Sequence, residues 1–492
     1  MGQIAPVFGS IVPSQTQLPL ANNYLAFNTA AAGANDFAQQ YLPEVYEAEV
    51  ERYGNRTLSG FLKMVGAEMP MTSDQVIWSE QNRLHISYTG CTLTGPGAGT
   101  FVFSVPTNAA VGATSIKNAI APNDTIVVMN PTTGVTLKGI VGAVAANGAL
   151  TNVTAYPFTA ANWDTLGIAA AAGAAGLKIF VYGSLFAKGT GSGSFSVQPQ
   201  FTQYSNQPII IKDRFEINGS DMAQIGWVEV ATEDGTSGYL WYLKSESETR
   251  LRFDDYLEMA MVEGELAAAG GGFVAQAANV PGFTATINAH GTEGLFQAIT
   301  NRGNIMSGFQ GATGISDFDQ ILKNLDTQGA IEENMLFLNR DTDLEFDDML
   351  SQISAGQAGG TAYGLFENSE DMALNLGFSG FRRGSYDFYK TSWKYLNDAS
   401  TRGAVAVNNI DGVLIPAGTS TVYDQILGTN IRRPFLHVRY RASQGDDRRY
   451  KNWITGTAGG AYTSEIDSMI VNWLSERCLV TQAANNFVLF QS

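Results

Sequence analysis

The proline-free stretch 235–270 most constrains the fold, because it is long, rich in good helix formers and bounded by glycines. Within it, Glu246 precedes Arg250 by four residues, an orientation that stabilises a helix. We expect one helix over about 237–269, roughly 50 Å long at 1.5 Å per residue. Its apolar residues form a narrow, drifting seam. This favours a spine that lies across a sheet and meets neighbouring copies; an ordinary surface helix is the alternative.

The charge balance argues against a protein built to grip nucleic acid. The net charge is −17, from 46 acidic and 29 basic residues, whereas nucleic-acid readers normally carry a basic stripe. Short arginine clusters are local exceptions that could contact phosphates or acidic neighbours, although solvated loops or structural ion pairs are the favoured explanation. These clusters are Arg382–Arg383, Arg432–Arg433, Arg439 with Arg441, and Arg448–Arg449.

Nothing in the sequence indicates an oxidising compartment or a membrane. Cys91 and Cys478 are distant from each other and form neither a disulfide framework nor a zinc motif. The N-terminus lacks the basic region and apolar core of a signal peptide. The most apolar run, 167–183, contains Lys178 and is too short to span a bilayer. We expect a soluble protein that is made inside the cell.

The N-terminal segment 1–45 has no charged side chain before Asp36, and Pro6, Pro13 and Pro19 interrupt any helix. It cannot form a core of its own, so its apolar residues need a surface supplied by another segment. We expect it to lie along its own domain or along a neighbouring subunit. A floppy tail is the alternative, which the apolar content disfavours.

Two extended segments, 76–88 and 208–217, are expected to pair as the legs of a long hairpin. Between them, 92–207 is rich in Gly, Ala, Thr and Val and contains only six charged residues. Its short strand signals at 100–104, 125–129, 135–141 and 178–182, with a tight turn at 131–134, predict a small β-sandwich or barrel inserted at the tip of the hairpin.

The C-terminal half alternates between helical and extended patterns. We expect helices at 292–310, at 317–325 with Ser316 as N-cap, and at 342–353. Strands are expected at 334–339, 412–419 and 433–441, and 466–490 is expected to close a sheet. The whole chain is therefore predicted to be α+β.

The sequence contains no catalytic constellation. His85, His290 and His437 are the only histidines, and none has a partner at metal-ligand spacing. Asp341, Asp343 and Glu345 resemble the start of a calcium loop but lack its glycine and terminal glutamate. Nucleotide-binding and nucleophile motifs are absent from the sequence. We expect no enzyme activity, no cofactor and no metal.

The order of these elements resembles the major capsid proteins of tailed bacteriophages with the Hong Kong 97-type fold. The resemblance covers most of the chain outside 92–207 and depends on the helical stretch 235–270, the strand 334–339 before a helix, and the ending 473–480. Several stretches are similar to those of the crAss-like phages. The resemblance implies an N-arm and first helix (1–58), an extended loop (59–91 and 208–218) carrying the inserted all-β domain (92–207), a peripheral domain with the spine helix (219–281), an axial domain (282–378) and a return to a terminal sheet (379–492).

A protein of this family assembles into hexamers and pentamers that form an icosahedral head shell around double-stranded DNA. The implied partners are other copies of the chain, the portal vertex, decoration proteins and head fibres bound by the inserted domain, and packaged DNA held without sequence specificity; no membrane is involved. The implied location is the virion, after synthesis in the host bacterial cytoplasm. The candidate intersubunit contacts are Phe8, Ile11, Tyr24, Phe27, Trp78, Arg83, Arg214, Arg250, Arg252, Arg382 and Arg383.

Two other classes of protein stay open. An encapsulin-like nanocompartment shell would share the fold but hold protein cargo. A glycan-binding or glycan-cleaving β-protein would need paired carboxylates in an aromatic-lined cleft. The central helix and the missing signal peptide argue against the second class.

Overall fold

The computed structural model describes residues 67–81, 85–94, 101–106, 119–147, 150–168, 176–191, 201–222, 230–231, 237–238, 241–283, 290–308, 314–328, 331–355, 379–404, 409–417, 419–424, 429–458 and 462–492. The predicted N-arm and first helix (1–58) lie outside these residues. The chain is a mixed α+β protein that consists mostly of strands, and it divides into two compact units. One unit is Ser79–Tyr204; the chain before and after it forms the other, here called the body.

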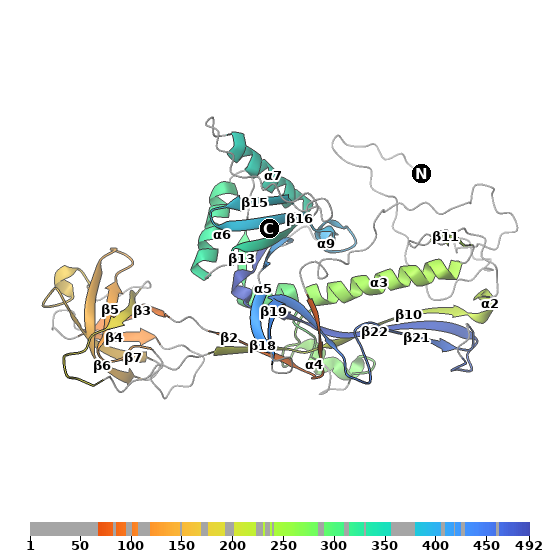
Figure 1. Cartoon of the computed structure of the whole chain (residues 1–492), viewed down its shortest axis with the longest axis horizontal. Coiled ribbons are helices and arrows are strands. Elements are labelled where there is room, and N and C mark those ends of the chain that lie inside the picture. Colours follow the sequence, from red (N-terminus) through yellow and green to blue (C-terminus); the bar gives the residue numbers. More distant parts are fainter. Residues whose placement is uncertain are drawn as a thin grey trace. The chain divides into compact units, whose positions relative to one another are not determined.

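A five-stranded sheet forms one half of the body (Figure 1). Its central strand is β22 (Ser468–Thr481), which pairs antiparallel with β10 (Ile209–Asn218) on one side and with β20 (Leu436–Arg441) and β21 (Lys451–Gly456) on the other. Strand β1 (Ala67–Met71) pairs in parallel with β20. The predicted strands at 208–217 and 433–441, and the predicted sheet at the C-terminus, are therefore confirmed.

The spine helix α3 (Trp241–Glu263) packs across this sheet. Phe253 and Leu257 of α3 form one apolar cluster with Met469, Val471 and Trp473, which alternate on one face of β22. This packing follows from the period of two in the strand and the narrow apolar seam of the helix. At 23 residues the helix is about 35 Å long, so the expected end at 269 was six residues too far.

The helix ends where the next residues pair with another segment. The carbonyl oxygen of Gly264 accepts a hydrogen bond from the Gly294 amide (2.8 Å), and the Ala267 amide donates to the His290 carbonyl (2.8 Å). A Cβ on Gly264 would lie 2.7 Å from the Thr292 carbonyl oxygen, so only glycine allows this approach. Helix propensity over 264–269 is overridden by this tertiary pairing.

A six-stranded sheet with helices on both faces forms the other half of the body. Its order is β13 (Asn304–Ser307), β23 (Val488–Gln491), β17 (Ile410–Pro416), β14 (Glu333–Leu338), β16 (Tyr386–Ser392) and β15 (Ser379–Arg383). One face packs against α6 (Gly314–Gln328) and α7 (Arg340–Ala355), and the other against α5 (Leu295–Arg302).

Several expectations for this half needed correction. The helix expected at 292–310 ends at Arg302, because Gly303 breaks it and β13 then pairs with β23. Ser316 is not an N-cap, since α6 begins at Gly314. The predicted strands at 334–339 and 412–419 and the helix at 342–353 are confirmed within a few residues.

The unit Ser79–Tyr204 contains a closed barrel in the order β3-β4-β7-β6-β5-β8. The strands are β3 (Ser87–Thr94), β4 (Phe101–Pro106), β5 (Asp124–Met129), β6 (Thr136–Asn147), β7 (Leu150–Pro157) and β8 (Leu177–Ser184). Trp163 is fully buried in its core and donates its Nε1–H to the Ala155 carbonyl (3.2 Å). The expected boundary between 91 and 92 falls inside β3.

The predicted tight turn at 131–134 is confirmed. The Gly134 amide donates to the Asn130 carbonyl (2.9 Å), and Gly134 has φ +72°, which favours glycine. Strand β7 had not been predicted from the sequence.

The hairpin expected between 76–88 and 208–217 does not form. Strand β2 (Val76–Gln81) pairs with β9 (Phe201–Asn206) in a two-stranded sheet, whereas β10 pairs with β22. The strand that returns beside β2 is β9, which comes directly before the predicted strand 208–217 in the chain.

Short elements complete the described part. They are α2 (Gly219–Met222), β11 (Val230–Ala231), β12 (Ser237–Gly238), α4 (Gly272–Gln276), α9 (Lys394–Asn397), β18 (Thr419–Asp424), β19 (Thr429–Pro434) and the 3-10 helices η1 (Asp164–Leu166), η2 (Ala277–Asn279), η4 (Arg402–Ala404) and η5 (Ala484–Asn486). None of the described helices is long and apolar enough to cross a bilayer.

Candidate functional site

The thiols and imidazoles of the described residues are not arranged for chemistry. Cys91 and Cys478 are free and buried, and burial raises the pKa of each to about 12, so neither supplies a thiolate at neutral pH. His290 and His437 each lie against a backbone carbonyl oxygen, at 3.2 Å and 3.1 Å. In the described part of the chain, no three His, Cys, Asp or Glu side chains gather closely enough to hold a metal ion.

A small depression lies beside the C-terminal half of α3. It has no enclosed room for even a water molecule, whereas typical ligand sites have roughly 300–1,000 Å³. It is lined by Glu258, Met259, Val262, Trp393 and Tyr395. Its size fits a packing defect better than a substrate pocket.

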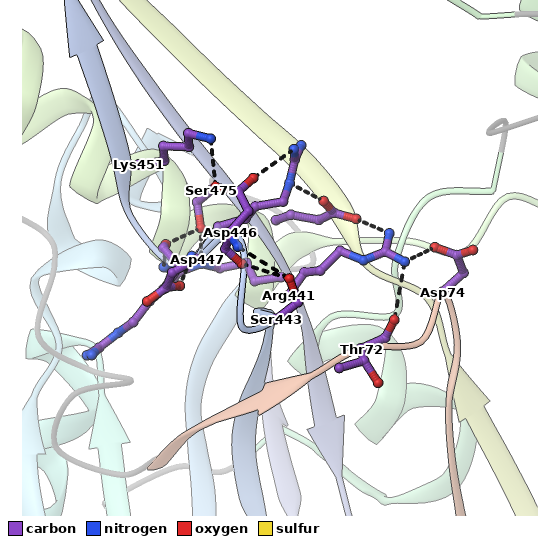
Figure 2. A network of polar contacts seen from close by, with 12 residues as sticks. Thr72, Asp74, Arg441, Ser443, Asp446, Asp447, Lys451 and Ser475 are labelled. Carbon is purple, nitrogen blue, oxygen red and sulfur yellow. Dashed lines mark hydrogen bonds and ion pairs between the residues drawn. The ribbon is translucent and has the colours of Figure 1, made fainter.

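A network of ion pairs and hydrogen bonds ties the segment 67–74 to the five-stranded sheet (Figure 2). Glu68 of β1 pairs with Arg449 and with Arg477 (3.3 Å). Just beyond β1, Asp74 pairs with Arg441 of β20 (2.5 Å), and the same guanidinium donates to the Thr72 carbonyl (3.5 Å). The network therefore fixes the point at which the chain leaves the sheet towards β2.

Glu476 of β22 is the buried acid of this network. Its two oxygens accept from Arg441 (2.8 Å) and pair with Arg448 (2.6 Å), and its side chain is 6% exposed. Hydrogen bonds to Glu476 and Asp74 raise the pKa of Arg441. The two arginines compensate for the hydration that this buried carboxylate loses.

The loop 442–450 closes the network from the other side. Arg477 donates to Ser475 Oγ (2.8 Å) and to the Arg449 carbonyl (2.9 Å), and burial lowers its pKa. Lys451 pairs with Asp446 (2.7 Å). The arginines at 441, 448 and 449 thus form structural ion pairs, as favoured from the sequence, rather than a surface for phosphates.

The candidate intersubunit contacts expected from the sequence fall into three groups. Phe8, Ile11, Tyr24, Phe27 and Arg83 lie outside the described residues.

Three others are engaged within their own chain. Trp78 is 7% exposed and lies under the Arg302 guanidinium (5.6 Å). Arg252 forms a two-pronged contact with Asp213 (3.0–3.2 Å), and Arg383 does so with Asp319 (2.6 and 2.8 Å). Of the remaining candidates, Arg214 also pairs with Glu216 (3.8 Å) and Arg382 with Asp387 (3.4 Å), although both are more than half exposed, and Arg250 is exposed.

Exposed apolar side chains occur on strand β21, at the free edge of the five-stranded sheet, and in the chain that follows it; Trp453 and Ile454 are neighbours in the strand and therefore point to opposite faces of the sheet. Here Trp453 is 39% exposed, Ile454 45%, Tyr462 86% and Ile466 57%. Several hydrogen bonds join β21 and the residues directly after it to 462–468, among them the Thr463 amide to the Gly456 carbonyl (2.8 Å) and the Thr457 hydroxyl to the Ile466 carbonyl (2.8 Å). We call residues 451–458 and 462–468 the edge hairpin.

The outer edge of the edge hairpin is open. Among the described strands, β21 pairs only with β22, so its other edge offers unpaired N–H and C=O groups. Soluble monomers usually protect such edges with charges, prolines or bulges, and exposed apolar patches mark interaction surfaces. Reasoning from the sequence missed this feature, although the run Trp453-Ile454 followed by Tyr462 and Ile466 was visible in it.

Strands β2 and β9 carry further exposed apolar residues. Ile77 is 58% exposed and Phe201 62%. Each strand pairs only with the other among the described strands, and an isolated two-stranded sheet is marginally stable in water.

No protein-family model and no curated protein matches the sequence. Similar solved structures include a chain from Mycobacterium phage Ogopogo (10% identity, 92% of this chain and 96% of that one, TM-score 0.38). They also include the capsid of the native GTA particle (9%, 95% and 99%, TM-score 0.34) and the mature capsid of bacteriophage PhiM1 (9%, 63% and 79%, TM-score 0.30). At TM-scores this low, the likenesses establish neither a shared fold nor a shared function.

Proposed function

We propose that this chain is a shell-forming structural protein: a major capsid protein of the Hong Kong 97 type that assembles into hexamers and pentamers around double-stranded phage DNA. It acts without catalysis, cofactor or metal. The support comes from the order of elements, from the spine helix across a sheet, and above all from the edge hairpin.

The edge hairpin is the main support for the proposal. The described part of a single chain leaves its apolar side chains exposed and the outer edge of β21 unpaired. Water-exposed Ile454 lies on the open edge strand, and water-exposed Ile466 lies in the chain that connects this strand to β22. Fully burying such a side chain is worth about 1.5–3 kcal/mol, so covering their exposed halves would contribute about 1–1.5 kcal/mol each. A second copy could cover these side chains with its own apolar residues and could also pair a strand with the open edge of β21.

Repetition turns such a modest contact into a stable shell. A surface that binds a different surface of the next copy generates rings when the rotation closes. Each copy then contributes the same contact, together with those we propose for β2, β9 and the segment 1–58. The summed interface resists the pressure of enclosed DNA without any single strong site.

The charge distribution fits a shell that encloses DNA without binding it tightly. The net charge is −17, and Arg441, Arg448 and Arg449 are committed to acids of their own chain. We propose that DNA is held without sequence specificity, and that a portal vertex and decoration or fibre proteins complete the particle.

The test replaces the apolar side chains of the edge hairpin. Ile454→Ser with Ile466→Ser should weaken association by about 30-fold to 150-fold, from a loss of about 2–3 kcal/mol. Sedimentation velocity and electron microscopy would measure particle yield, and circular dichroism would check that the subunit stays folded. Val280→Ser, in a turn and 37% exposed, is the matched control. Full assembly by the double variant would refute the role of the hairpin.

The contents of particles made in cells distinguish a phage capsid from an encapsulin-like nanocompartment. Double-stranded DNA inside them supports the capsid, whereas a defined protein cargo without DNA would assign the chain to the second class.

A further inference from the structure

The barrel carries aromatic side chains on its outer surface that the described part of the chain leaves exposed. Tyr156 is 42% exposed, Phe158 47%, Phe180 39% and Tyr182 49%. Four large aromatic side chains exposed on one small barrel exceed the scattered apolar residues of an ordinary surface.

Strand register brings these residues together. Phe180 of β8 lies opposite Val127 of β5, which lies opposite Lys138 of β6. The Lys138 ammonium lies 5.7 Å from the centre of the Tyr182 ring, and the Lys138 carbonyl accepts from the Phe158 amide (3.1 Å).

The next row extends the surface to β7, because Ile140 of β6 lies opposite Tyr156. Lys178 follows the same outward alternation of β8 as Phe180. We call Lys138, Tyr156, Phe158, Lys178, Phe180 and Tyr182 the aromatic face.

The charge of the aromatic face is opposite to that of the rest of the chain. Its two ionisable cations are exposed lysines, and the nearby carboxylate of Asp124 is used internally, accepting from the Ala121 amide (2.7 Å). The sequence 79–204 has five basic and three acidic residues, a net charge of +2, so the other residues carry −19 of the total.

We propose that the aromatic face binds an acidic surface on the body of a second copy of this chain. The inference rests on the proposed function, which places many copies side by side. Two aromatic faces would bring lysines against lysines, so barrel-to-barrel pairing is disfavoured. The body offers surfaces of the required kind. On α7, for example, exposed Leu344 (52%) lies one turn from exposed Asp341.

Aromatic side chains suit this role because they bury a large area at a small cost in conformational entropy. The lysines favour an acidic partner. The cation–π contact with Tyr182 also holds the Lys138 side chain in place. Binding of this kind weakens as salt rises, because the charges are exposed.

The test is site-specific photo-crosslinking in particles assembled from the purified full-length chain. A benzophenone amino acid replaces Tyr182, with Thr133 in an exposed turn as the control position. Particles are mixed from ¹⁵N-labelled and unlabelled chains, so that mass spectrometry separates links between copies from links within one copy. We expect covalent dimers that join the barrel to peptides outside 79–204, and few from the control position.

Charge reversal supplies the second arm. Lys138→Glu with Lys178→Glu should lower the yield of crosslinked dimer about tenfold, whereas Lys188→Glu should leave it unchanged. Barrel-to-barrel links, links within one copy, or no links in well-formed particles would overturn the inference while the proposed function stands. Failure of the unaltered chain to form any particle would instead remove the proposed function on which the inference rests.

Discussion

Replacing Glu476 by Gln tests the buried ion pairs that anchor β1 to the five-stranded sheet. The substitution keeps the size of the side chain but removes the charge that faces Arg441 (2.8 Å) and Arg448 (2.6 Å). Breaking a fully buried pair costs about 3–5 kcal/mol. Here the two arginines are 30% and 28% exposed and Arg441 keeps Asp74, so solvent screens part of the loss. We expect a loss of about 2–3 kcal/mol.

The assay is urea unfolding of dissociated subunits, followed by tryptophan fluorescence, because Trp473 lies in the core of the same sheet. Glu465→Gln, at an exposed position, is the control and should change stability by less than about 0.5 kcal/mol. Hydrogen exchange should also become faster at the β1 amides, which the network holds against β20. A Glu476→Gln chain as stable as the control, with unchanged exchange at β1, would refute the reasoning.

Three further predictions concern the barrel core, a constrained glycine and acid stability. Trp163→Ala empties a fully buried site and should destabilise the barrel by about 3–5 kcal/mol; calorimetry should show its transition shifted and that of the body unchanged. Gly456→Ala should abolish soluble folding, since φ is +126° and a Cβ would overlap the neighbouring strand, whereas Gly445→Ala, in open space, should be neutral in expression trials. Burial raises the pKa of Glu263, but the hydrogen-bonded Arg402 outweighs it and the net pKa is lowered. The pairing with Arg402 therefore stabilises the fold above the pKa that Glu263 has in the unfolded chain, and this stabilisation is lost below about pH 4. The Glu263→Gln variant lacks it, so lowering the pH should destabilise this variant less than the unaltered chain.

Local patterns in the sequence predicted the elements well. The spine helix follows from uninterrupted helix formers and the pairing of Glu246 with Arg250, and the structure has it at Trp241–Glu263. The alternation in 178–182 predicted β8, whose residues alternate between buried and exposed. Both signals act over a few residues, which is the range that periodicity reports.

Partners distant in sequence were not predictable in the same way. The strand at 208–217 was expected, but its pairing with β22 instead of β2 depends on residues at least 250 positions away. Glu68 and Arg477 are 409 positions apart and form one ion pair. No local pattern encodes such pairs, because they follow from the topology of the sheets.

The candidate site was also only partly predictable. The arginine clusters were recognised, with solvated loops or structural ion pairs as the favoured explanation. The edge hairpin was missed because Trp453 and Ile454 look like core residues in sequence, and only their 39% and 45% exposure shows that they are not. Residues that a second copy would cover have the same composition as core residues. Only their exposure in the folded chain identifies them.

Sedimentation velocity of the purified full-length chain most directly tests whether one copy is incomplete without others. We predict closed megadalton particles, visible as uniform hollow shells by electron microscopy, that form without any added protein. A single species at 52.7 kDa, unchanged across concentration, salt and pH, would contradict the account.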